Sequence, residues 1–585
     1  MSTSPISPID FVTRNFDYLV VGGGTAGLAV AARLSEDPSL TVGVLEAGLE
    51  APKEDSINTP DRALQTLGTK YDWQFETVPQ AGLGGRTLAW PRGKVLGGTS
   101  ALNLMTWNRG NKEDYDAWEK LGNKGWGWNG LQPFFRKSET FHLPDAESQT
   151  SNRQYFNTQD FGTGGPVHVS YSKSYSRIQK ICYDSLANLG IPENKTHNAG
   201  SNVGVWTNLM SVNPENNTRS YASSAYYVPN SHRQNLFVLT EALAQEIIMS
   251  QESVGWTATG IRFTHGGNSF TVSASREIIL SAGSVQSPQL LELSGIGDPQ
   301  VLKDAGIEVK VTNPNVGENL QDHLMTISVY EVDPSVQKAE GRPPETPYCY
   351  LPILAVVSQD VFEQLTSKVK ALEKSSPEKS EILRSRFDRT TSLGQFEYIF
   401  KPEPSRSEEY VNILQILQYP FSRGSIHVQK QPESERVNKE QSTIADNPRI
   451  DPGYYSGPHG EIDLEVMTEC MQFSDRLCRS TPLSDVVYSR IAPPPSVDKG
   501  HDLRDWVIQN TTTDWHPIGT CGMGGRGVHS GVVDDRLRVY GVARLRVIDA
   551  SIMPLQISAH LQATVYAIAE KGAHMIRQDN LERRI

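Results

Sequence analysis

Cysteine is scarce in this sequence, and long apolar runs and clusters of basic residues are missing from it. Only 5 of the 585 residues are cysteine. None of them lies in a C-x-x-C pair, so neither a disulfide framework nor a thiolate metal site is indicated. No apolar run approaches the length that spans a bilayer. The formal net charge is −12, and without a basic patch we expect neither a nucleic-acid partner nor a membrane surface.

The opening stretch, MSTSPISPIDFVTRN, has neither the basic region nor the apolar region of an export signal. As written, the sequence therefore predicts a cytoplasmic protein. Three N-x-[ST] sequons, at Asn194, Asn216 and Asn510, leave a mature secreted form open. The length exceeds what one hydrophobic core usually organises, so we expect two domains.

Glycine, by contrast, is abundant, with 48 residues, and one stretch uses it in an ordered way. Gly22, Gly24 and Gly27 form a G-x-G-x-x-G pattern between the apolar run Tyr18–Val21 and the helix-like run Ala26–Leu34. Glycines at these places allow a tight turn, the close approach of a pyrophosphate and the close packing of a helix on a strand. The pattern therefore predicts a strand, a phosphate-binding turn and a helix.

Glu46 completes this pattern, because it ends the strand-like run TVGVLE, 19 residues after Gly27. A carboxylate at that place suits a ribose hydroxyl, so the whole stretch predicts a dinucleotide site without separating NAD from FAD. Two further glycine-rich stretches, Gly93–Asp116 and Gly283–Gly297, are typical of backbone-donor loops that lead into helices. Such loops suit an extended ligand with phosphate and aromatic portions.

Taken together, these motifs resemble those of the glucose-methanol-choline (GMC) oxidoreductases, which bind FAD. The two family signatures match Gly93–Asp116 and Gly283–Gly297. The segments VGENLQDH (Val316–His323) and HPIGTCGM (His516–Met523) are also very similar to family segments, and the resemblance spans about residues 16–576. It implies an α/β fold, in which a Rossmann-type FAD-binding domain is interlaced with an α+β substrate-binding domain of an antiparallel sheet plus helices.

The resemblance also implies that both domains are discontinuous in the chain. The FAD-binding domain is expected to take residues 14–170, with some substrate-domain loops, and residues 235–330 and 531–585. The substrate domain is expected to take residues 171–234 and 331–530. Within the latter, residues 331–415 carry proline clusters and the charge-rich run EQLTSKVKALEKSSPEKSEILRSRFDR, which predict a solvated helical excursion.

Two histidines near the C-terminus are the candidate catalytic residues. His516 lies between a tryptophan and a proline, and His560 follows 44 residues later, just before a helix-like run. The resemblance implies that both face the flavin ring. Since the unperturbed pKa of imidazole lies nearest neutrality, one ring can take the hydroxyl proton of an alcohol while a hydride leaves the carbinol carbon. We assign His516 as the base and His560 as its hydrogen-bonding partner. No metal is predicted, because only Asp514 offers a further ligand nearby in sequence.

The resemblance implies further contacts with FAD and the substrate. Asn103 stands where some relatives carry a histidine that is tethered to the flavin, so we predict that FAD is bound non-covalently. The residues expected to contact FAD are Gly22, Gly24, Thr25, Ala26, Gly27, Glu46, Gly97, Thr99, Asn103, Ala244, Asp549, Ala550 and Ser551. The residues expected to contact the substrate are Trp107, Trp515 and Asp514, and core filling is an equal alternative for the two tryptophans.

The substrate is the least determined feature. Similarity to fungal glucose oxidases and dehydrogenases favours a sugar, but those enzymes carry Arg and Asn where this chain has Thr512 and Asp514. Trp515 beside His516 resembles aryl-alcohol and furfural-type oxidases, which favours planar alcohols. Formate is disfavoured, because formate oxidase carries Arg at the position of His560.

We therefore expect an FAD-dependent enzyme that oxidises a primary aromatic, allylic, furanic or sugar-type alcohol. Its hydride acceptor is flavin N5, and O2 or a quinone-like compound reoxidises the flavin. The alternative is a redox-silent lyase or cyclase of the same family, which uses the two histidines for acid–base catalysis.

Overall fold

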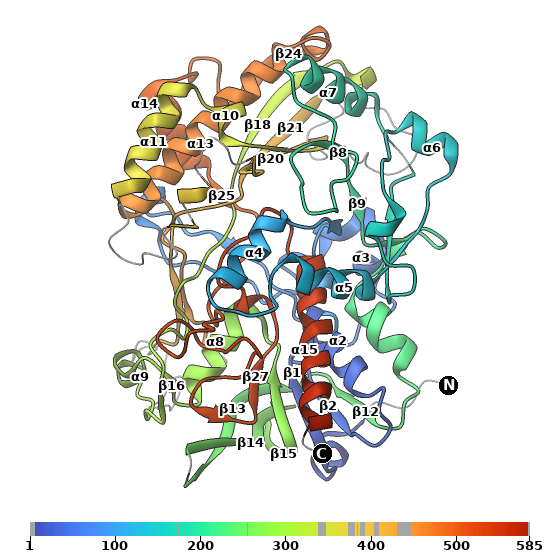
Figure 1. Cartoon of the computed structure of the whole chain (residues 1–585), viewed down its shortest axis with the longest axis vertical. Coiled ribbons are helices and arrows are strands. Elements are labelled where there is room, and N and C mark those ends of the chain that lie inside the picture. The colour runs from blue at the N-terminus through green and yellow to red at the C-terminus, as the bar shows by residue number, and fades with distance from the viewer. Residues whose placement is uncertain are drawn as a thin grey trace.

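Two large sheets occupy opposite halves of the molecule (Figure 1). The structure is a computed structural model, and it describes residues 6–173, 175–253, 255–336, 347–371, 381–382, 384–386, 392–402, 409–429 and 446–582. The first sheet is parallel at its centre, and the second is antiparallel. The predicted α/β fold class, with a Rossmann-type domain interlaced with an α+β domain, is confirmed.

The parallel centre of the first sheet is built from segments that lie far apart in the chain. Its strands follow the order β12-β2-β1-β15, and β27 pairs with β15. These strands are β1 (Phe16–Val21), β2 (Val42–Leu45), β12 (Leu236–Leu239), β15 (Asn268–Leu280) and β27 (Leu545–Val547). All four residues of β2 are buried, as expected of a parallel strand with both faces covered. Segments from the beginning, middle and end of the chain thus form one core.

Helices cover this sheet and extend it into an antiparallel meander. α2 (Thr25–Leu34) connects β1 to β2, and α15 (Gln562–Glu582) packs against α2 and α5 (Trp128–Ser138). α8 (Gly283–Leu293) follows β15, whose first half pairs with β14 (Gly255–His265). β14 pairs in turn with β13 (Leu243–Glu252) and β26 (Val542–Ala543).

The second sheet follows the order β24-β18-β21-β20-β19-β8, and β25 also pairs with β18. Its strands are β8 (Gly204–Thr207), β18 (Leu324–Val332), β19 (Pro347–Leu351), β20 (Phe396–Pro402), β21 (Tyr410–Leu417), β24 (Val487–Ala492) and β25 (Thr512–Thr513). The helices on this side are α7 (Arg177–Asn188), α10 (Ile353–Val356), α11 (Gln359–Ala371), α13 (Gly457–Cys478) and α14 (Gly500–Asn510). The domain boundary expected at residue 330 falls inside β18, all of which belongs to this sheet.

The two faces of the second sheet have different surroundings. On β18, buried and half-buried residues alternate, as expected of a strand. Thr326 is fully buried, and its hydroxyl donates to the sulfur of Met471 on α13 at 3.2 Å. The intervening residues Met325 and Ile327 are half-buried and line a cavity. One face therefore packs on helix α13, and the other forms a wall of that cavity.

Shorter elements connect and flank the two sheets. A further sheet follows the order β5-β9-β7-β6, with β5 (Thr106–Trp107), β6 (Glu139–Phe141), β7 (Val167–Tyr171) and β9 (Leu209–Met210). Two-stranded ladders join β3 (Phe75–Glu76) to β4 (Ala89–Trp90), β10 (Val212–Asn213) to β11 (Thr218–Arg219), β16 (Ile296–Gly297) to β17 (Val311–Thr312), and β22 (Ser425–His427) to β23 (Arg449–Asp451). The remaining helices include α1 (Pro8–Val12), α3 (Asp55–Asn58), α4 (Lys112–Lys120), α6 (Ala146–Ser151) and α9 (Pro299–Asp304).

Other expectations from the sequence can be compared with the structure. All five cysteines are buried and free, as expected of structural thiols.

The charge-rich run begins as a helix, because α11 buries Phe362, Leu365 and Val369 on one side, and part of the run lies outside the described residues. Residues 331–415 also contribute β19, β20 and β21, so this region is more than a helical excursion. In the described part of the chain, the helices are too short or too polar to cross a membrane.

Candidate active site

A cavity of about 510 Å³ is lined by residues from both large sheets. On one side, the carboxyl ends of β1 and β2 contribute Val21, Leu45 and the residues that follow them. On the other side, β18, β20 and β21 contribute the face that is turned away from α13. Ligands of open α/β sheets bind outside the carboxyl ends of the strands, so this is where the fold favours a cofactor.

The glycine pattern forms a close-packed turn at the cavity wall. Gly22 has φ of +100°, and a Cβ atom added there would lie 2.4 Å from the carbonyl oxygen of Ser281. A Cβ atom at Gly27 would lie 1.9 Å from the Gly22 oxygen, and one at Gly98 would lie 2.7 Å from the Cα atom of Gly24. Gly24 is the N-cap of α2 and offers no side-chain cap, so the first N–H groups of the helix are left for another acceptor. Backbone N–H groups at a helix N-terminus suit a pyrophosphate.

Glu46 lies beside this turn, directly after β2, and lines the same cavity. Its Oε2 accepts a hydrogen bond from the Gly23 N–H at 2.8 Å, and its Oε1 accepts one from the Gly48 N–H at 2.7 Å. Burial raises the pKa of Glu46 to about 7, against the opposing effect of these two hydrogen bonds. The carboxylate retains free lone pairs for a hydroxyl donor, which fits the ribose of a dinucleotide.

Two other predicted segments complete the cofactor side. Asn103 is fixed by its own contacts, since its Oδ1 accepts from the Met105 N–H at 3.0 Å and its amide group bonds with Gln562. Asp549 accepts hydrogen bonds from the Ser551 N–H at 2.8 Å and the Gly283 N–H at 2.9 Å. The first contact caps the short 3₁₀ helix η10 (Ala550–Ile552), and the second ties this segment to the start of α8. These residues fit FAD in kind and in place.

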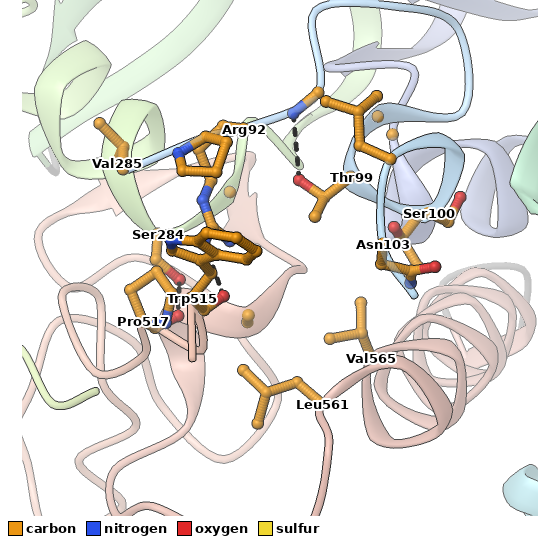
Figure 2. Close-up of a pocket in the computed structure, with 18 of the residues that line it drawn as sticks. Arg92, Thr99, Ser100, Asn103, Ser284, Val285, Trp515, Pro517, Leu561 and Val565 are labelled. Atoms are coloured by element: carbon orange, nitrogen blue, oxygen red, sulfur yellow. Dashed lines mark hydrogen bonds between the residues drawn. The ribbon is translucent and has the colours of Figure 1, made fainter. Parts of the chain in front are cut away.

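The structure brings most of the predicted site residues to one cavity. Figure 2 shows Asn103 and Thr99 on the side opposite Trp515 and Pro517. The predicted residues that line the cavity are Gly22, Gly24, Thr25, Ala26, Glu46, Thr99, Asn103, Ala244, Asp514, Trp515, His516, Asp549, Ala550 and His560.

Four predicted residues lie behind the cavity wall. Gly27, Gly97 and Ser551 belong to the turns that shape the wall, and Trp107 lies in the core. The Trp107 ring is fully buried, packs at 5.9 Å from the Tyr566 ring, and donates its indole N–H to Glu139 at 2.8 Å. Trp107 therefore occupies the position expected of a core residue, which was one of the two alternatives for it.

The two candidate catalytic histidines meet at the cavity. The ring centroids of His516 and His560 lie 4.8 Å apart, with the planes at 89°. The backbone N–H of His516 donates to Asp322 at 2.7 Å, and that of His560 donates to Asn108 at 3.0 Å. The backbone at both histidines is therefore held by buried polar groups, and the two rings face one small region of the cavity.

A third histidine, His323, determines which nitrogen of His516 carries a proton. His323 is fully buried, and its Nε2 lies 3.0 Å from the carbonyl oxygen of Ile557, so this nitrogen is the donor. Burial lowers the pKa of His323 well below its usual range, which keeps the ring neutral. Its Nδ1 is then an acceptor, and it lies 3.0 Å from His516 Nδ1. His516 must therefore donate from Nδ1, which leaves its Nε2 with a free lone pair.

Asp514 strengthens this arrangement. Its Oδ2 lies 3.1 Å from the same Nδ1 of His516, in a close charge contact that is not aligned as a hydrogen bond. Burial opposes the charged carboxylate, but the His516, His560 and His323 rings outweigh it and lower the pKa of Asp514 to about 2. A fixed negative charge therefore lies beside the histidine pair.

His560 is held in a different electrostatic state. Its Nε2 lies 3.0 Å from Oε1 of Glu397, a fully buried carboxylate whose Oε2 accepts from Gln418 at 3.0 Å. Burial alone would lower the pKa of His560, but the charge and hydrogen bond of Glu397 outweigh it and raise this pKa. The protonated ring is therefore favoured more than in a free imidazole. Nδ1 is the ring nitrogen that remains for a ligand.

Trp515 occupies a strained backbone position next to His516. Its φ is +60°, which is uncommon for a bulky residue and is held by surrounding contacts. The guanidinium of Arg92 donates to the Trp515 carbonyl at 2.6 Å, and the Trp515 N–H donates to the hydroxyl of Thr513 at 2.8 Å. Figure 2 shows the indole beneath Arg92 at the cavity wall. The ring can thus form one side of a binding slot for a flat molecule.

The structure adds potential metal ligands that the sequence reasoning did not count. Within the described residues, His323, Asp514 and His516 form one group of close ligand atoms, and Glu397, Asp514 and His560 form another. In both groups the atoms already contact each other as donors, acceptors and ion pairs. The hydrogen-bonding network accounts for this geometry, and the absence of a metal stays a prediction.

His323 and Glu397 are the functional residues that sequence reasoning missed. His323 ends the segment VGENLQDH, from which the sequence predicts no role for it. Glu397 lies in β20, with no motif around it. Their partners are 193 and 163 residues away in the chain. For Glu397 the sequence offers no signal. For His323 the signal is that it follows an acidic residue at the end of a segment that resembles the family.

Comparison with known proteins agrees with this geometry and confirms the resemblance. Two family models, both described as GMC oxidoreductase, match residues 16–325 and 420–569. The dehydrogenase mpl7 of Monascus purpureus is 37% identical, with 98% of each chain covered. An FAD-dependent oxidoreductase from Chaetomium thermophilum has a similar structure, with a TM-score of 0.87, 27% identity and coverage of 97% of this chain and 100% of that one. A fungal aryl-alcohol oxidase gives a TM-score of 0.83 and 25% identity, with 97% and 99% covered.

Proposed function

Because the chain belongs to the GMC oxidoreductase family, whose members depend on FAD, we propose that it oxidises a primary alcohol. The observation that carries this proposal is the histidine pair, whose rings lie 4.8 Å apart on the cavity that also contains the glycine turn. When bound, FAD supplies the hydride acceptor for such a reaction. The residues that would hold it are those of the glycine turn, Glu46, Ala244 and the segment Asp549–Ser551.

His516 acts as the base. Its Nδ1 is committed to His323 and Asp514, so Nε2 offers the lone pair that takes the hydroxyl proton. Taking this proton builds carbonyl character at the carbinol carbon, which is the condition for hydride loss. General base catalysis of this kind contributes about 10² to 10⁴ in rate.

His560 stabilises the oxygen that loses its proton. The charge of Glu397 favours the protonated ring, and Nδ1 is free to donate to the substrate oxygen. A fixed cation aimed at a developing alkoxide is effective in a cavity with little water. The two histidines thus take different roles: one accepts the proton, and the other balances the charge that remains.

The wall opposite the cofactor side favours a flat, largely apolar alcohol. Met325, Ile327, Ile399 and Leu414 line it, and Trp515 lines the same cavity. Such a slot suits an aromatic, allylic or furanic alcohol better than a sugar, which needs several hydrogen-bonding partners. The similar fold of a fungal aryl-alcohol oxidase supports the same choice. O2 or a quinone-like compound would then reoxidise the flavin.

The test is an anaerobic titration of the purified holoenzyme, followed in the visible flavin band. We expect benzyl, cinnamyl or furfuryl alcohol to bleach the band, and glucose to do so weakly or not at all. Readmission of air then separates an oxidase, whose band returns at once, from a dehydrogenase, which needs a quinone.

A flavin band that none of these alcohols bleaches would contradict the proposal. In that case the redox-silent alternative takes its place, and the search turns to substrates that are cleaved or cyclised without losing electrons.

A further inference from the structure

Lys401 places a positive charge on the substrate side of the cavity. It lies on β20, whose successive side chains point to opposite faces of the sheet. Tyr398 is buried on the face toward α13, where its ring packs 5.0 Å from that of Phe473. Glu397, Ile399 and Lys401 share the other face: Glu397 binds His560, and Ile399 and Lys401 line the cavity. The strand thus carries the partner of a catalytic histidine and a cation on one face.

Within the described ranges, the side chains around Lys401 leave its charge without a partner. Its neighbours on this face are Ile399, Asn412 in the directly paired position of β21, and Leu414. Among the described residues, no hydrogen bond or ion pair engages its ammonium group. Lys401 is half-buried beside apolar side chains, so an anion near its ammonium group would gain a charge-assisted contact.

The carboxylates of the cavity do not supply that anion. Glu46 accepts two backbone hydrogen bonds, and Asp549 accepts from Ser551 and Gly283. Asp514 lies against His516, and Glu397 lies against His560. Each acid has its own partner, so Lys401 is available to an incoming group.

The spacing along β20 sets where such a group would lie. Lys401 lies four positions after Glu397 on this strand, which corresponds to about 13 Å between their Cα atoms. His560 lies 3.0 Å from Glu397, and the charge of Lys401 is close enough to lower the pKa of His560, so the histidine pair and the ammonium group act on one cavity from different positions along the strand. One molecule can contact both if its hydroxyl and its anion are separated by a spacer such as an aromatic ring.

We propose that the substrate is an aromatic alcohol with a carboxylate on the side of the ring opposite the carbinol carbon, and that Lys401 binds this carboxylate. The inference rests on the proposed oxidation of a primary alcohol and narrows it to acidic substrates. The charge-assisted contact orients the ring, so that the hydroxyl group meets His516 Nε2.

The experiment compares 4-(hydroxymethyl)benzoate with its neutral amide, 4-(hydroxymethyl)benzamide, in anaerobic flavin reduction by the holoenzyme. We expect the acid to be preferred by about tenfold in reduction efficiency, with a preference that weakens as salt is added. Lys401→Met should remove the preference, and Lys401→Arg should retain it. Lys370→Met changes an exposed lysine on α11 and serves as the matched control, with the preference intact. Equal use of acid and amide, or a preference that survives Lys401→Met, would overturn the inference.

A second measurement separates this inference from the proposed function. 4-Methylbenzoate and 4-methylbenzamide have no hydroxyl group, so their binding is measured by the change in the flavin spectrum without any oxidation. If 4-methylbenzoate binds more tightly than the amide, and Lys401→Met removes this difference, the anion site is supported. This holds even if no alcohol bleaches the flavin, and in that event only the proposed oxidation fails. Equal binding of the two probes overturns the anion site.

Discussion

Two substitutions of His323 would separate its effect on catalysis from its effect on stability. His323 uses Nδ1 to accept from His516 and Nε2 to donate to the Ile557 carbonyl, each at 3.0 Å. In His323→Asn, the side-chain oxygen stands near the place of Nδ1, so the acceptor for His516 is kept and the donor is lost. In His323→Gln, the amide nitrogen reaches the place of Nε2, so the donor is kept and the acceptor is lost.

The expected magnitudes follow from the contacts. Loss of the acceptor in His323→Gln removes one hydrogen bond from His516, about 1–2 kcal/mol, which slows flavin reduction roughly 5- to 30-fold. The effect stays below that of removing the base, because Asp514 still contacts the same Nδ1 at 3.1 Å. Loss of the donor in His323→Asn leaves the buried Ile557 carbonyl unpaired, which costs about 1–3 kcal/mol of folding stability.

The assay is anaerobic stopped-flow reduction with benzyl alcohol, together with the thermal midpoint of the holoenzyme. We expect His323→Gln to lower the limiting reduction rate with little change in the dissociation constant of the alcohol, and to keep its thermal midpoint. His323→Asn should show the reverse. His197→Gln, at a buried histidine away from the cavity, is the control for a general effect of such substitutions. A wild-type reduction rate in His323→Gln would refute the assignment of the His516 tautomer.

Three further predictions concern the histidine pair and the cofactor. His516→Ala should slow flavin reduction by about 10² to 10⁴ while FAD stays bound, as seen by stopped flow and the visible spectrum; an almost unchanged rate would remove His516 from its role. Glu397 raises the pKa of His560, so the charged ring persists to higher pH in the wild type. Glu397→Gln should therefore move the high-pH decline of the reduction rate to lower pH, and a decline at the wild-type pH would contradict this. Acid precipitation should release free FAD into the supernatant, because Asn103 offers no tether, whereas a yellow pellet would show a covalent link.

The cofactor side could be predicted from the sequence because its determinants are local. The turn, the strand and the helix lie within one stretch, and the predicted helix Ala26–Leu34 differs from α2 by a single residue at its start. The glycine pattern itself indicates the close packing of the turn. The structure agrees, since a Cβ atom at Gly27 would lie 1.9 Å from the Gly22 oxygen.

The substrate side could not be predicted in the same way, because distant segments form it. Glu397 and Lys401 acquire their roles from the pairing of β20 with β21, and the sequence alone does not give that register. Trp107 shows a different limit: its place within a family signature left ligand contact and core filling as equal alternatives, and its ring fills the core next to Tyr566. Sequence spacing does not separate these outcomes when an aromatic residue suits both environments.

The different roles of His516 and His560, as proton acceptor and as stabiliser of charge, follow from their neighbours, because the two side chains are the same. His516 faces a neutral acceptor, His323, so its Nδ1–H is held and its Nε2 stays free to accept. His560 faces a carboxylate, Glu397, which favours the charged ring. Environments that push two similar groups into different protonation states identify the base and the acid of a site. If the neighbours set the roles, Glu397→Gln should weaken the stabilisation of charge by His560 and leave the proton acceptor intact. Reduction should then slow at high pH more than at low pH, because only the protonated His560 is lost.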